Sequence, residues 1–447
     1  MRNSNKIKQY LLEVTTRSPL RVGNGNEESI GVLLIDNHAF ISGTSIAGLF
    51  NSFLLKKKKM QENQLLEEVY KEVSGEDLRN KKKESAIYFY DNYSKEQVTE
   101  KDLIYRDHLK IDGKLGSNSS GQLFGEYYVS KGKSFEIRFE VRGENLKEDY
   151  YNEICKCLQE FIYELEDGRI TIGSKATFGF GKLKVKGCYL REFCLKDIED
   201  FKDYINQKNI CRDKLEKKDI KEFKGKYSEQ EIKIIFKGYC EDGLIIKDGV
   251  KKSNDEKGDI IVSHKENNKY IIPSSSIKGV LRAYIYKIYR TLYPENGEEE
   301  LIEFFGCKVN GKEGKKGRLI FEDCEINIKE LPIYNRIKID RFTGGVYSGS
   351  LFREEVITVD KNNPLEFVIK VIEKNEKILG LIILALRDMA LGYLTIGSGN
   401  NVGYGRIKGI SIEIQGYTSD NLKVQFKNNK LEGNVDEINK IIKSIKE

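Results

Sequence analysis

The sequence contains no tryptophan and only three histidines among its 447 residues. With His38, His108 and His264 as the only imidazoles, histidine-based metal chemistry and a Ser-His-Asp catalytic triad have little material. The eight cysteines are scattered, and the close pair Cys155 and Cys157 has no second pair that would complete a zinc site. We therefore expect reduced cysteines in or near hydrophobic cores.

Long apolar segments are also missing. No run reaches the roughly 18 apolar residues that span a bilayer, and the first residues contain no signal-peptide core. We therefore expect a cytoplasmic protein without membrane contact. The net charge is only +6, but it balances 76 basic against 70 acidic side chains. Such a balance allows strongly basic faces beside acidic ones, so it neither proves nor excludes a nucleic-acid partner.

What the sequence does have is internal repetition. Three motifs each occur twice in the same order, at residues 42–48 and 273–279, 108–126 and 336–354, and 171–182 and 395–406. The two copies of each motif are separated by nearly the same length of chain, which is about half of the whole. A period of this length is far beyond that of solenoid repeats, so each copy should be a complete domain with its own core.

The two copies predict an α+β fold. In each, strand-like segments alternate with two helical patterns in the order strand–helix–strand, strand–helix–strand, which suggests a ferredoxin-like domain with insertions. We place the first domain at residues 1–194 and the second at 231–417. A highly charged linker at 195–230 separates them, and a strand with a short amphipathic helix follows at 418–447.

Glycine-rich loops close both copies. They contain Gly397, Gly399, Gly403, Tyr404, Gly405 and Arg406 in the second copy, and Gly173, Gly179, Phe180, Gly181 and Lys182 in the first. Backbone without Cβ atoms can approach a phosphate closely, the basic residue adds charge, and the ring offers a face for a base. The alternative is a tight turn whose glycines only satisfy backbone geometry.

Serine-rich helix starts form the second motif. The predicted caps are Thr44 and Ser45 in the first copy, and Ser274, Ser275 and Ser276 in the second. A helix N-terminus presents free N–H groups and the positive end of the helix dipole, which suits a phosphate. Lys278 and Arg282, four residues apart on one helix face, add a basic face that the first copy lacks. The alternative is an ordinary capped helix.

These segments resemble a known family. The residues that carry the likeness are 273–279, 305–306, 317–323, 339–352 and the terminal glycine-rich loop, together with their order and spacing. They resemble the backbone subunits of type III CRISPR effector complexes, which are proteins of the RAMP superfamily. The chain looks like two such subunits fused head to tail.

The resemblance implies a modified RNA-recognition fold in each copy. It implies that a CRISPR guide RNA lies along the capped helix and the glycine-rich loop, and that other effector subunits are partners. It also implies projecting thumb hairpins in the regions 112–124 and 340–352, with Arg341 among the RNA-binding residues. In such subunits the thumb wedges into the duplex of guide and complementary target RNA, while base pairing reads the sequence.

The family cuts target RNA beside each thumb with an aspartate and a divalent cation. That position falls on or next to Asp259, with Asp255 as a second candidate in the same loop. A carboxylate there could hold Mg²⁺ or another divalent cation, with Asp259 as the metal ligand, and help to orient the ribose 2′-hydroxyl. The alternative is a solvated turn aspartate. In the first copy the position falls near Ile30, which puts cleavage there in doubt.

The leading hypothesis is therefore a guide-RNA-binding backbone subunit whose second domain is an RNA-guided endoribonuclease. One rival is a scaffold with the same RNA path and no cleavage. Another is a guide-processing endoribonuclease, which shares tandem ferredoxin-like domains and a glycine-rich loop but would cut precursor RNA without metal.

Overall fold

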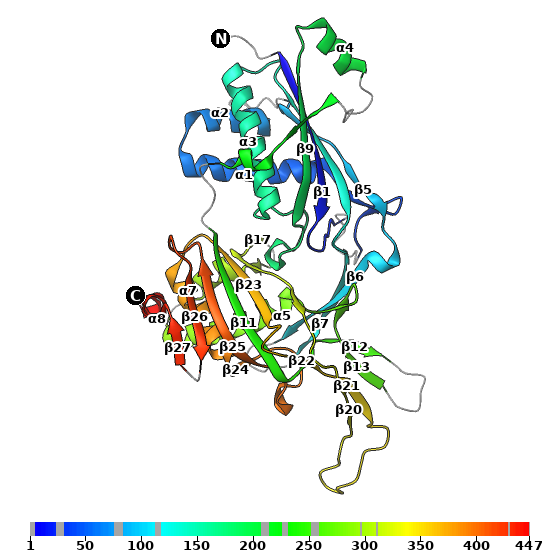
Figure 1. Cartoon of the computed structure of the whole chain (residues 1–447), viewed down its shortest axis with the longest axis vertical. Helices are drawn as coiled ribbons and strands as arrows, with labels where there is room; N and C mark the ends of the chain where they lie inside the picture. Colours follow the sequence, from blue (N-terminus) through cyan, green and yellow to red (C-terminus); the bar gives the residue numbers. More distant parts are fainter. Residues whose placement is uncertain are drawn as a thin grey trace. The chain divides into compact units, whose positions relative to one another are not determined.

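The computed structural model describes the chain at residues 5–23, 31–75, 84–111, 118–206, 214–225, 231–251, 259–295, 297–309, 312–427 and 430–446. The chain divides into two compact units (Figure 1). Unit 1 comprises residues 1–105, 125–176 and 180–228. Unit 2 comprises residues 106–124, 177–179 and 229–447. Most of the hairpin of the first repeat therefore belongs to unit 2.

The first part of the chain, up to residue 228, contains both long helices and long strands. Its elements are β1 (Lys6–Thr16), β2 (Leu34–Ile35), β3 (His38–Ile41), α1 (Gly43–Gln61), α2 (Gln64–Ser74), β4 (Ile87–Phe89), β5 (Asn92–Gln97), η1 (Glu100–Asp102), β6 (Leu103–Ile111), β7 (Asn118–Val129), β8 (Ser134–Arg142), α3 (Glu148–Asp167), η2 (Ala176–Phe178), β9 (Leu183–Cys194), α4 (Ile198–Asn206), β10 (Glu216–Lys218) and η4 (Ile220–Phe223).

The sheet of unit 1 is centred on β1. This strand pairs antiparallel with β8 on one side and β9 on the other, and β4 and β5 extend the sheet beyond β8. Helices α1 and α3 pack together, with the rings of Phe50 and Phe161 5.3 Å apart edge to face. The order β9-β1-β8-β4, with a helix after β1 and another after β8, is consistent with a ferredoxin-like domain.

The rest of the chain follows a related plan. Its elements are β11 (Glu231–Leu244), β12 (Lys247–Lys251), β13 (Asp259–Ser263), β14 (Lys265–Glu266), β15 (Lys269–Ile272), α5 (Ser274–Leu292), α6 (Glu299–Phe305), β16 (Cys307–Val309), β17 (Lys312–Lys315), β18 (Leu319–Phe321), β19 (Cys324–Ile326), β20 (Ile333–Arg336), β21 (Phe352–Glu355), β22 (Ile357–Val359), β23 (Leu365–Ile372), α7 (Glu376–Ala390), β24 (Leu391–Thr395), η5 (Asn400–Val402), β25 (Arg406–Gln415), β26 (Leu422–Lys427), β27 (Lys430–Gly433), α8 (Val435–Lys443) and η6 (Ser444–Lys446).

The sheet of unit 2 repeats the strand order of unit 1. Strand β11 pairs antiparallel with β23 and β25, and β18 lies beyond β23, which makes the order β25-β11-β23-β18. Helices α5 and α7 follow β11 and β23 in the chain, as α1 and α3 follow β1 and β8. Because both orders and both helix positions agree, the structure is consistent with a duplicated domain.

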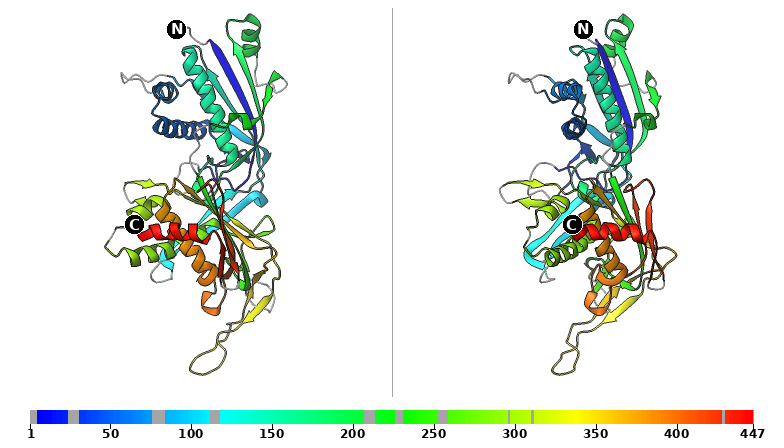
Figure 2. Two further views of the ribbon diagram at one scale, coloured as in Figure 1. Left: turned by 60° about the vertical axis from the view of Figure 1, so that its left-hand side comes forward. Right: turned by 90° about the vertical axis from the view of Figure 1, so that its left-hand side faces the viewer.

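Apolar residues at helical spacing explain why α5 and α7 pack on their sheet. Ile277, Leu281 and Ile285 of α5 are all buried in one core with the apolar face of α7. Full burial of a side chain of this size stabilises a fold by about 1.5–3 kcal/mol. Helix α8 and the turn η6 that follows it pack across α7 (Figure 2), where Ile441 of α8 and Ile445 of η6 lie against Gly380. The C-terminal helix is therefore part of the core of unit 2.

The expected α+β class is confirmed, and each half of the chain bears a large antiparallel sheet. Other details differ. The segment predicted as a linker, residues 195–230, carries α4, β10 and η4, and it is grouped with unit 1 up to residue 228. The tail after residue 417 has two strands, β26 and β27, instead of one. The domain boundaries stay a prediction.

The cysteines follow the expectation. Among the described residues, seven cysteines are free, and five of them are buried. Burial raises the pKa of the Cys155 thiol to about 11 and that of Cys157 to about 12, so both stay protonated and unreactive at neutral pH. No helix in the described part of the chain is long and apolar enough to cross a membrane.

Candidate functional site

The first turn of α1 in unit 1 and of α5 in unit 2 is capped by a carboxylate. In unit 1 the backbone N–H of Gly43 donates to Asp91 at 2.8 Å, and in unit 2 that of Ser274 donates to Asp323 at 2.8 Å. Both aspartates lie shortly after the end of a strand, β4 or β18. The negative charge satisfies an orphan amide and the positive end of the helix dipole.

This finding changes our expectation of an open anion site at these helix starts. A phosphate that approached Ser274 would meet the carboxylate of Asp323, and the N–H of Ser276 already bonds to the carbonyl of Pro273 at 2.9 Å. Ser275 and Ser276 are half-buried in the first turn of α5, whose N-cap residue, Pro273, makes no side-chain hydrogen bond. In unit 1 the cap is Ser42, whose hydroxyl accepts from the N–H of Ser45, so Thr44 and Ser45 lie inside α1.

This pair of capping aspartates was missed in the sequence. The stretches 87–91 and 319–323 correspond in the two copies, because Phe89 matches Phe321 and Asp91 matches Asp323 at one common spacing. That spacing is close to the spacing of the other repeated motifs. A comparison of the two copies could therefore have found the pair.

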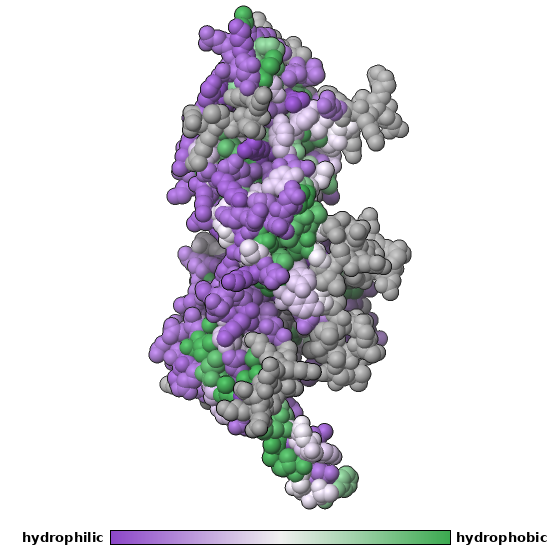
Figure 3. All heavy atoms as spheres, turned by 90° about the vertical axis from the view of Figure 1, so that its right-hand side faces the viewer, coloured by the Kyte–Doolittle hydropathy of each residue, from purple (hydrophilic) through white to green (hydrophobic). Residues whose placement is uncertain are grey.

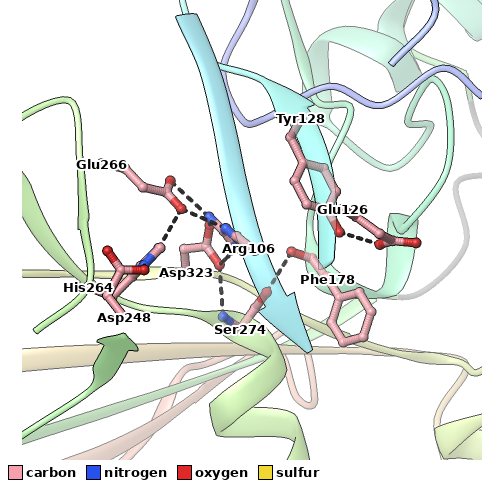
Figure 4. A network of polar contacts seen from close by, with 9 residues as sticks. All are labelled: Arg106, Glu126, Tyr128, Phe178, Asp248, His264, Glu266, Ser274 and Asp323. Carbon is pink, nitrogen blue, oxygen red and sulfur yellow. Dashed lines mark hydrogen bonds and ion pairs between the residues drawn. The ribbon is translucent and has the colours of Figure 1, made fainter. Parts of the chain in front are cut away.

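Asp323 belongs to a network of charged side chains in unit 2 (Figure 4). Arg106, on β6, is 3% exposed and binds Glu266 through Nε and Nη2 at 2.6 and 2.9 Å. The same guanidinium binds Asp323 through Nη1 and Nη2 at 3.1 and 2.7 Å. Burial opposes the charge, but the two carboxylates raise the pKa of Arg106 well above its usual range. Arg106 therefore ties the first-repeat strand β6 to the start of α5.

His264 extends this network of charged side chains. Its Nδ1 lies 2.7 Å from Oδ1 of Asp248 and its Nε2 lies 2.8 Å from Oε1 of Glu266. Burial opposes protonation, but the hydrogen bonds to both carboxylates outweigh it and raise the pKa of His264 to about 9. Burial likewise opposes ionisation of Glu266, but His264 and Arg106 lower its pKa to about 2. At neutral pH His264 is a cation between two anions.

The basic face expected on α5 is only partly accessible. Lys278 is 9% exposed, and its ammonium lies 3.3 Å from Oγ1 of Thr177 and 5.1 Å from the ring centroid of Phe178. Burial, and then the charge of Arg282, lower the pKa of Lys278 to about 8. Arg282 is half-buried over the rings of Tyr286 and Phe305. Lys278 therefore faces protein in this structure.

The glycine-rich loops of the two units make the same internal hydrogen bonds. In unit 2, N–H groups of residues 396, 398 and 405 donate to the carbonyls of Gly405, Ile245 and Gly243. In unit 1, those of residues 172, 174 and 181 donate to the carbonyls of Gly181, Arg21 and Pro19. Each donor and each acceptor in one loop has its counterpart in the other at the same spacing along the chain. Three backbone amides of each loop are therefore used to fasten that loop to its own unit and do not point to a phosphate.

The glycines of these loops have a geometric reason. Gly181 and Gly405 have φ angles of 73° and 78°, and a Cβ on them would lie 1.9 and 2.1 Å from the carbonyl oxygens of Ile172 and Ile396. A Cβ on Gly173, Gly179 or Gly397 would likewise meet a backbone carbonyl. A Cβ on Gly399 would meet the ring of Tyr404, and one on Gly403 would meet nothing within 4 Å. The turn geometry alone accounts for most of these glycines.

The rings in these loops are buried, and this corrects the expected stacking. Phe180 is 2% and Tyr404 is 6% exposed, and Tyr404 packs with Ile245 and Val356 and accepts a hydrogen bond from Arg336. Neither ring presents an open face to a base. The basic residues differ: Lys182 is half-buried, whereas Arg406 is exposed at the start of β25. Within the described residues no ion pair joins Arg406 to a carboxylate.

A long hairpin projects from unit 2 between β20 and β21 (Figure 1). Asp340 turns its tip by accepting the N–H groups of Phe342 and Thr343, and these bonds lower the pKa of its carboxyl. Phe342 is 99% exposed, and neighbouring apolar side chains along both arms are also exposed. Figure 3 shows apolar surface along this projection. Arg341 is exposed beside Phe342 at the tip.

Of the two predicted catalytic residues, the backbone of Asp259 lies near the base of this hairpin. Asp259 begins β13, which runs parallel to β21 with Asp259 as the partner of Phe352. The side chain of Asp259 and the whole of Asp255 lie outside the described residues. The tip of the first-repeat hairpin, residues 112–117, also lies outside them. In the part of the chain that the structure describes, no three His, Cys, Asp or Glu side chains gather as a metal site.

One family matches the chain. The sequence model of the RAMP superfamily matches residues 13–184 and 206–408, which together cover most of both units. No curated protein matches the chain significantly.

We expect Gly405→Ala to destabilise the protein more than Gly403→Ala. Both changes place a side chain at positive φ, which costs about 1–2 kcal/mol, but only Gly405→Ala also drives a Cβ into a backbone carbonyl. The extra crowding should add about 1–3 kcal/mol. Thermal unfolding of the two variants measures the difference. Equal melting temperatures would contradict the close contact at Ile396.

We expect His264 to make the stability depend on pH. Its pKa is raised in the folded state, so its contribution is complete below its ordinary pKa near 6.5 and is lost as pH rises through about 9. One pKa unit corresponds to about 1.4 kcal/mol, so the loss is on the order of 3 kcal/mol. Melting temperatures of the protein and of His264→Gln across this range test it. A variant with the same pH dependence as the parent would assign the effect to other groups.

Proposed function

The chain belongs to the RAMP superfamily, and from this premise we propose that it is a guide-RNA-binding backbone subunit of a type III CRISPR interference complex. Membership of the superfamily implies a CRISPR RNA-binding protein. Beyond that membership, we propose that the chain forms part of the backbone of the complex and binds other effector subunits. We also propose that the second copy cleaves target RNA and that the projecting hairpin acts as a thumb.

The observation that carries the proposal is the exposed apolar hairpin of unit 2. A soluble protein gains nothing from a phenylalanine that is 99% exposed at the end of a long projection unless a partner covers it. Apolar side chains of this kind insert between base pairs and unstack them. The hairpin would therefore wedge into the duplex of guide and target RNA, and Arg341 beside Phe342 would contact a phosphate.

The position of Asp259 supports cleavage beside that wedge. Because Asp259 pairs with Phe352, it lies where the hairpin rejoins the body of unit 2. A target nucleotide displaced by the hairpin would pass this point. Its ribose 2′-hydroxyl would lose its proton to water as the 2′-oxygen bonds to the neighbouring phosphorus. The bond from phosphorus to the 5′-oxygen would break, and the departing 5′-oxygen would take a proton from water. The carboxylate of Asp259 would orient the 2′-hydroxyl for this attack.

A divalent cation beside Asp259 would be held mainly by the RNA, with one carboxylate supplied by the protein. Mg²⁺ typically keeps several waters and is bound by one or two carboxylates together with substrate phosphates. Such an ion would stabilise negative charge on the phosphate when bound. Asp259 would be its protein ligand.

We expect Asp259→Ala in the assembled complex to abolish one target-cleavage product. The rate of that cut should fall by a factor of about 10²–10⁴, the range for loss of a positioned proton-transfer group, while guide and target RNA stay bound. Denaturing gels of labelled target RNA, with and without a chelator, measure the products.

Asp255→Ala is the matched control from the same loop, and it should keep the full set of products. Loss of the product in Asp255→Ala alone would move the catalytic role to that residue. An unchanged set of products in both variants would make the protein a non-cleaving scaffold. Metal-independent cutting of precursor RNA by the isolated protein would favour a guide-processing endoribonuclease.

We expect Arg406→Glu to weaken guide-RNA binding and to flatten its salt dependence. Arg406 is the exposed basic residue that the glycine-rich loop presents, so the change removes about one phosphate contact and about one unit of slope in log Kd against log salt. Filter binding over a salt series measures both. Lys423→Glu is the control, because Lys423 is exposed on β26 opposite Glu413, toward the other end of β25. An unaltered slope in Arg406→Glu would remove the loop from the RNA path.

A further inference from the structure

The strand that enters the glycine-rich loop of unit 2 carries an aromatic ring in an unusual position. Tyr393, in β24, is 76% exposed, and Leu391 on the same strand is 51% exposed. Tyr404, the aromatic residue of the glycine-rich loop motif, is buried. Tyr393 is exposed, and it lies outside the repeated motif.

A bulge accounts for the exposure of Tyr393. Strands β24 and β25 lie side by side (Figure 1), with Leu391 paired to Lys408 and Thr395 paired to Arg406. More residues of β24 than of β25 lie between these two pairs, so β24 bulges away from the sheet. Bulges of this kind re-aim side chains and are frequent beside functional sites.

The other unit shows that the fold does not require this ring. The spacing that relates the two glycine-rich loops places Arg169 at the position of Tyr393 and Gly168 at that of Gly392. The two glycines have nearly the same φ, 79° and 78°, so the backbone turn is shared. In unit 1 the following side chain is an arginine, which is 15% exposed and paired with Glu164 and Asp167. The exposed ring is a feature of unit 2 alone in this pair.

Two cations lie on the strand beside the ring. Lys408 is paired with Glu241 at 2.8 Å, so its ammonium already has a carboxylate partner. Arg406 is exposed and, in the described part of the chain, has no carboxylate partner. An exposed ring beside an arginine on the next strand is the arrangement that holds single-stranded nucleic acid, with a base on the ring and a phosphate on the cation.

We propose that Tyr393 is an RNA-stacking residue that works together with Arg406. A single-stranded segment of RNA lies across β24 and β25, one base stacks on the ring of Tyr393, and an adjacent phosphate contacts Arg406. This inference rests on the proposed function, because it names the place where unit 2 holds unpaired RNA. It replaces Tyr404 as the aromatic contact of the glycine-rich loop.

The test uses the full chain and two oligoribonucleotides of equal length, an oligouridylate and an abasic strand. Loss of one base–aromatic stack should make Tyr393→Ala bind oligouridylate about 5- to 150-fold more weakly. Its affinity for the abasic strand should not change, because that strand has no base to stack. Tyr393→Phe should keep the affinity, and Tyr93→Ala, which removes another exposed ring, is the matched control.

A fluorescent reporter at residue 393 distinguishes this proposal from the proposed function of the whole chain. The chain has no tryptophan, so Tyr393→Trp introduces a single indole. Its emission should be quenched when oligouridylate binds and not when the abasic strand binds. Oligouridylate that binds without quenching, or with the same affinity in Tyr393→Ala, overturns the role of Tyr393 and leaves the proposed function standing.

Two further outcomes are distinct. If Tyr393→Ala keeps its RNA affinity but fails to join the effector complex, the ring contacts a protein subunit and the RNA proposal is overturned. If the parent chain binds neither oligouridylate nor any guide RNA, the proposed function itself fails.

Discussion

A carboxylate at the first turn of the main helix organises both units. Asp91 in unit 1 and Asp323 in unit 2 accept the first amide of α1 and α5, and so join the helix to the strand region that precedes the aspartate. In unit 2 the charge of Asp323 is balanced by Arg106, which also binds Glu266. Burying these charges is tolerable only because each is paired and hydrogen-bonded. The helix, the inserted strand β6 and the histidine beside Glu266 are thereby held in one arrangement.

This arrangement changes where RNA can be held. The first amide of α5 and several loop amides are engaged within the protein, and Lys278 is buried, so they form a support for contacts made elsewhere. The exposed side chains include Arg406 and Tyr393 at the glycine-rich loop, and Arg341 and Phe342 at the hairpin tip. Unit 2 thus exposes two separate pairs, each made of one arginine and one aromatic ring. Two such pairs suit an extended nucleic-acid strand better than a small ligand.

Much of the fold could be read from the sequence, because periodicity and repetition are local signals. The long strands, the helices α3, α5 and α7, and the existence of two related halves follow from apolar spacing and from three repeated motifs. Less of the candidate RNA-binding site could be predicted from the sequence. The rings of Tyr404 and Phe180 looked accessible because a motif shows residue types and not burial. Arg106 gave no sign of its role, because its partners Glu266 and Asp323 belong to the other repeat, far along the chain.

The sequence by itself determined the duplication, the α+β class and the family, since each depends on residue order along the chain. Only the tertiary structure decided which charges meet and which surfaces stay open. Whether an amide, a lysine or a ring can contact RNA depends on what already contacts it, and those neighbours come from distant segments. The two units illustrate the reason: with the same backbone turn after the second helix, one holds a half-buried arginine paired with carboxylates and the other exposes a tyrosine.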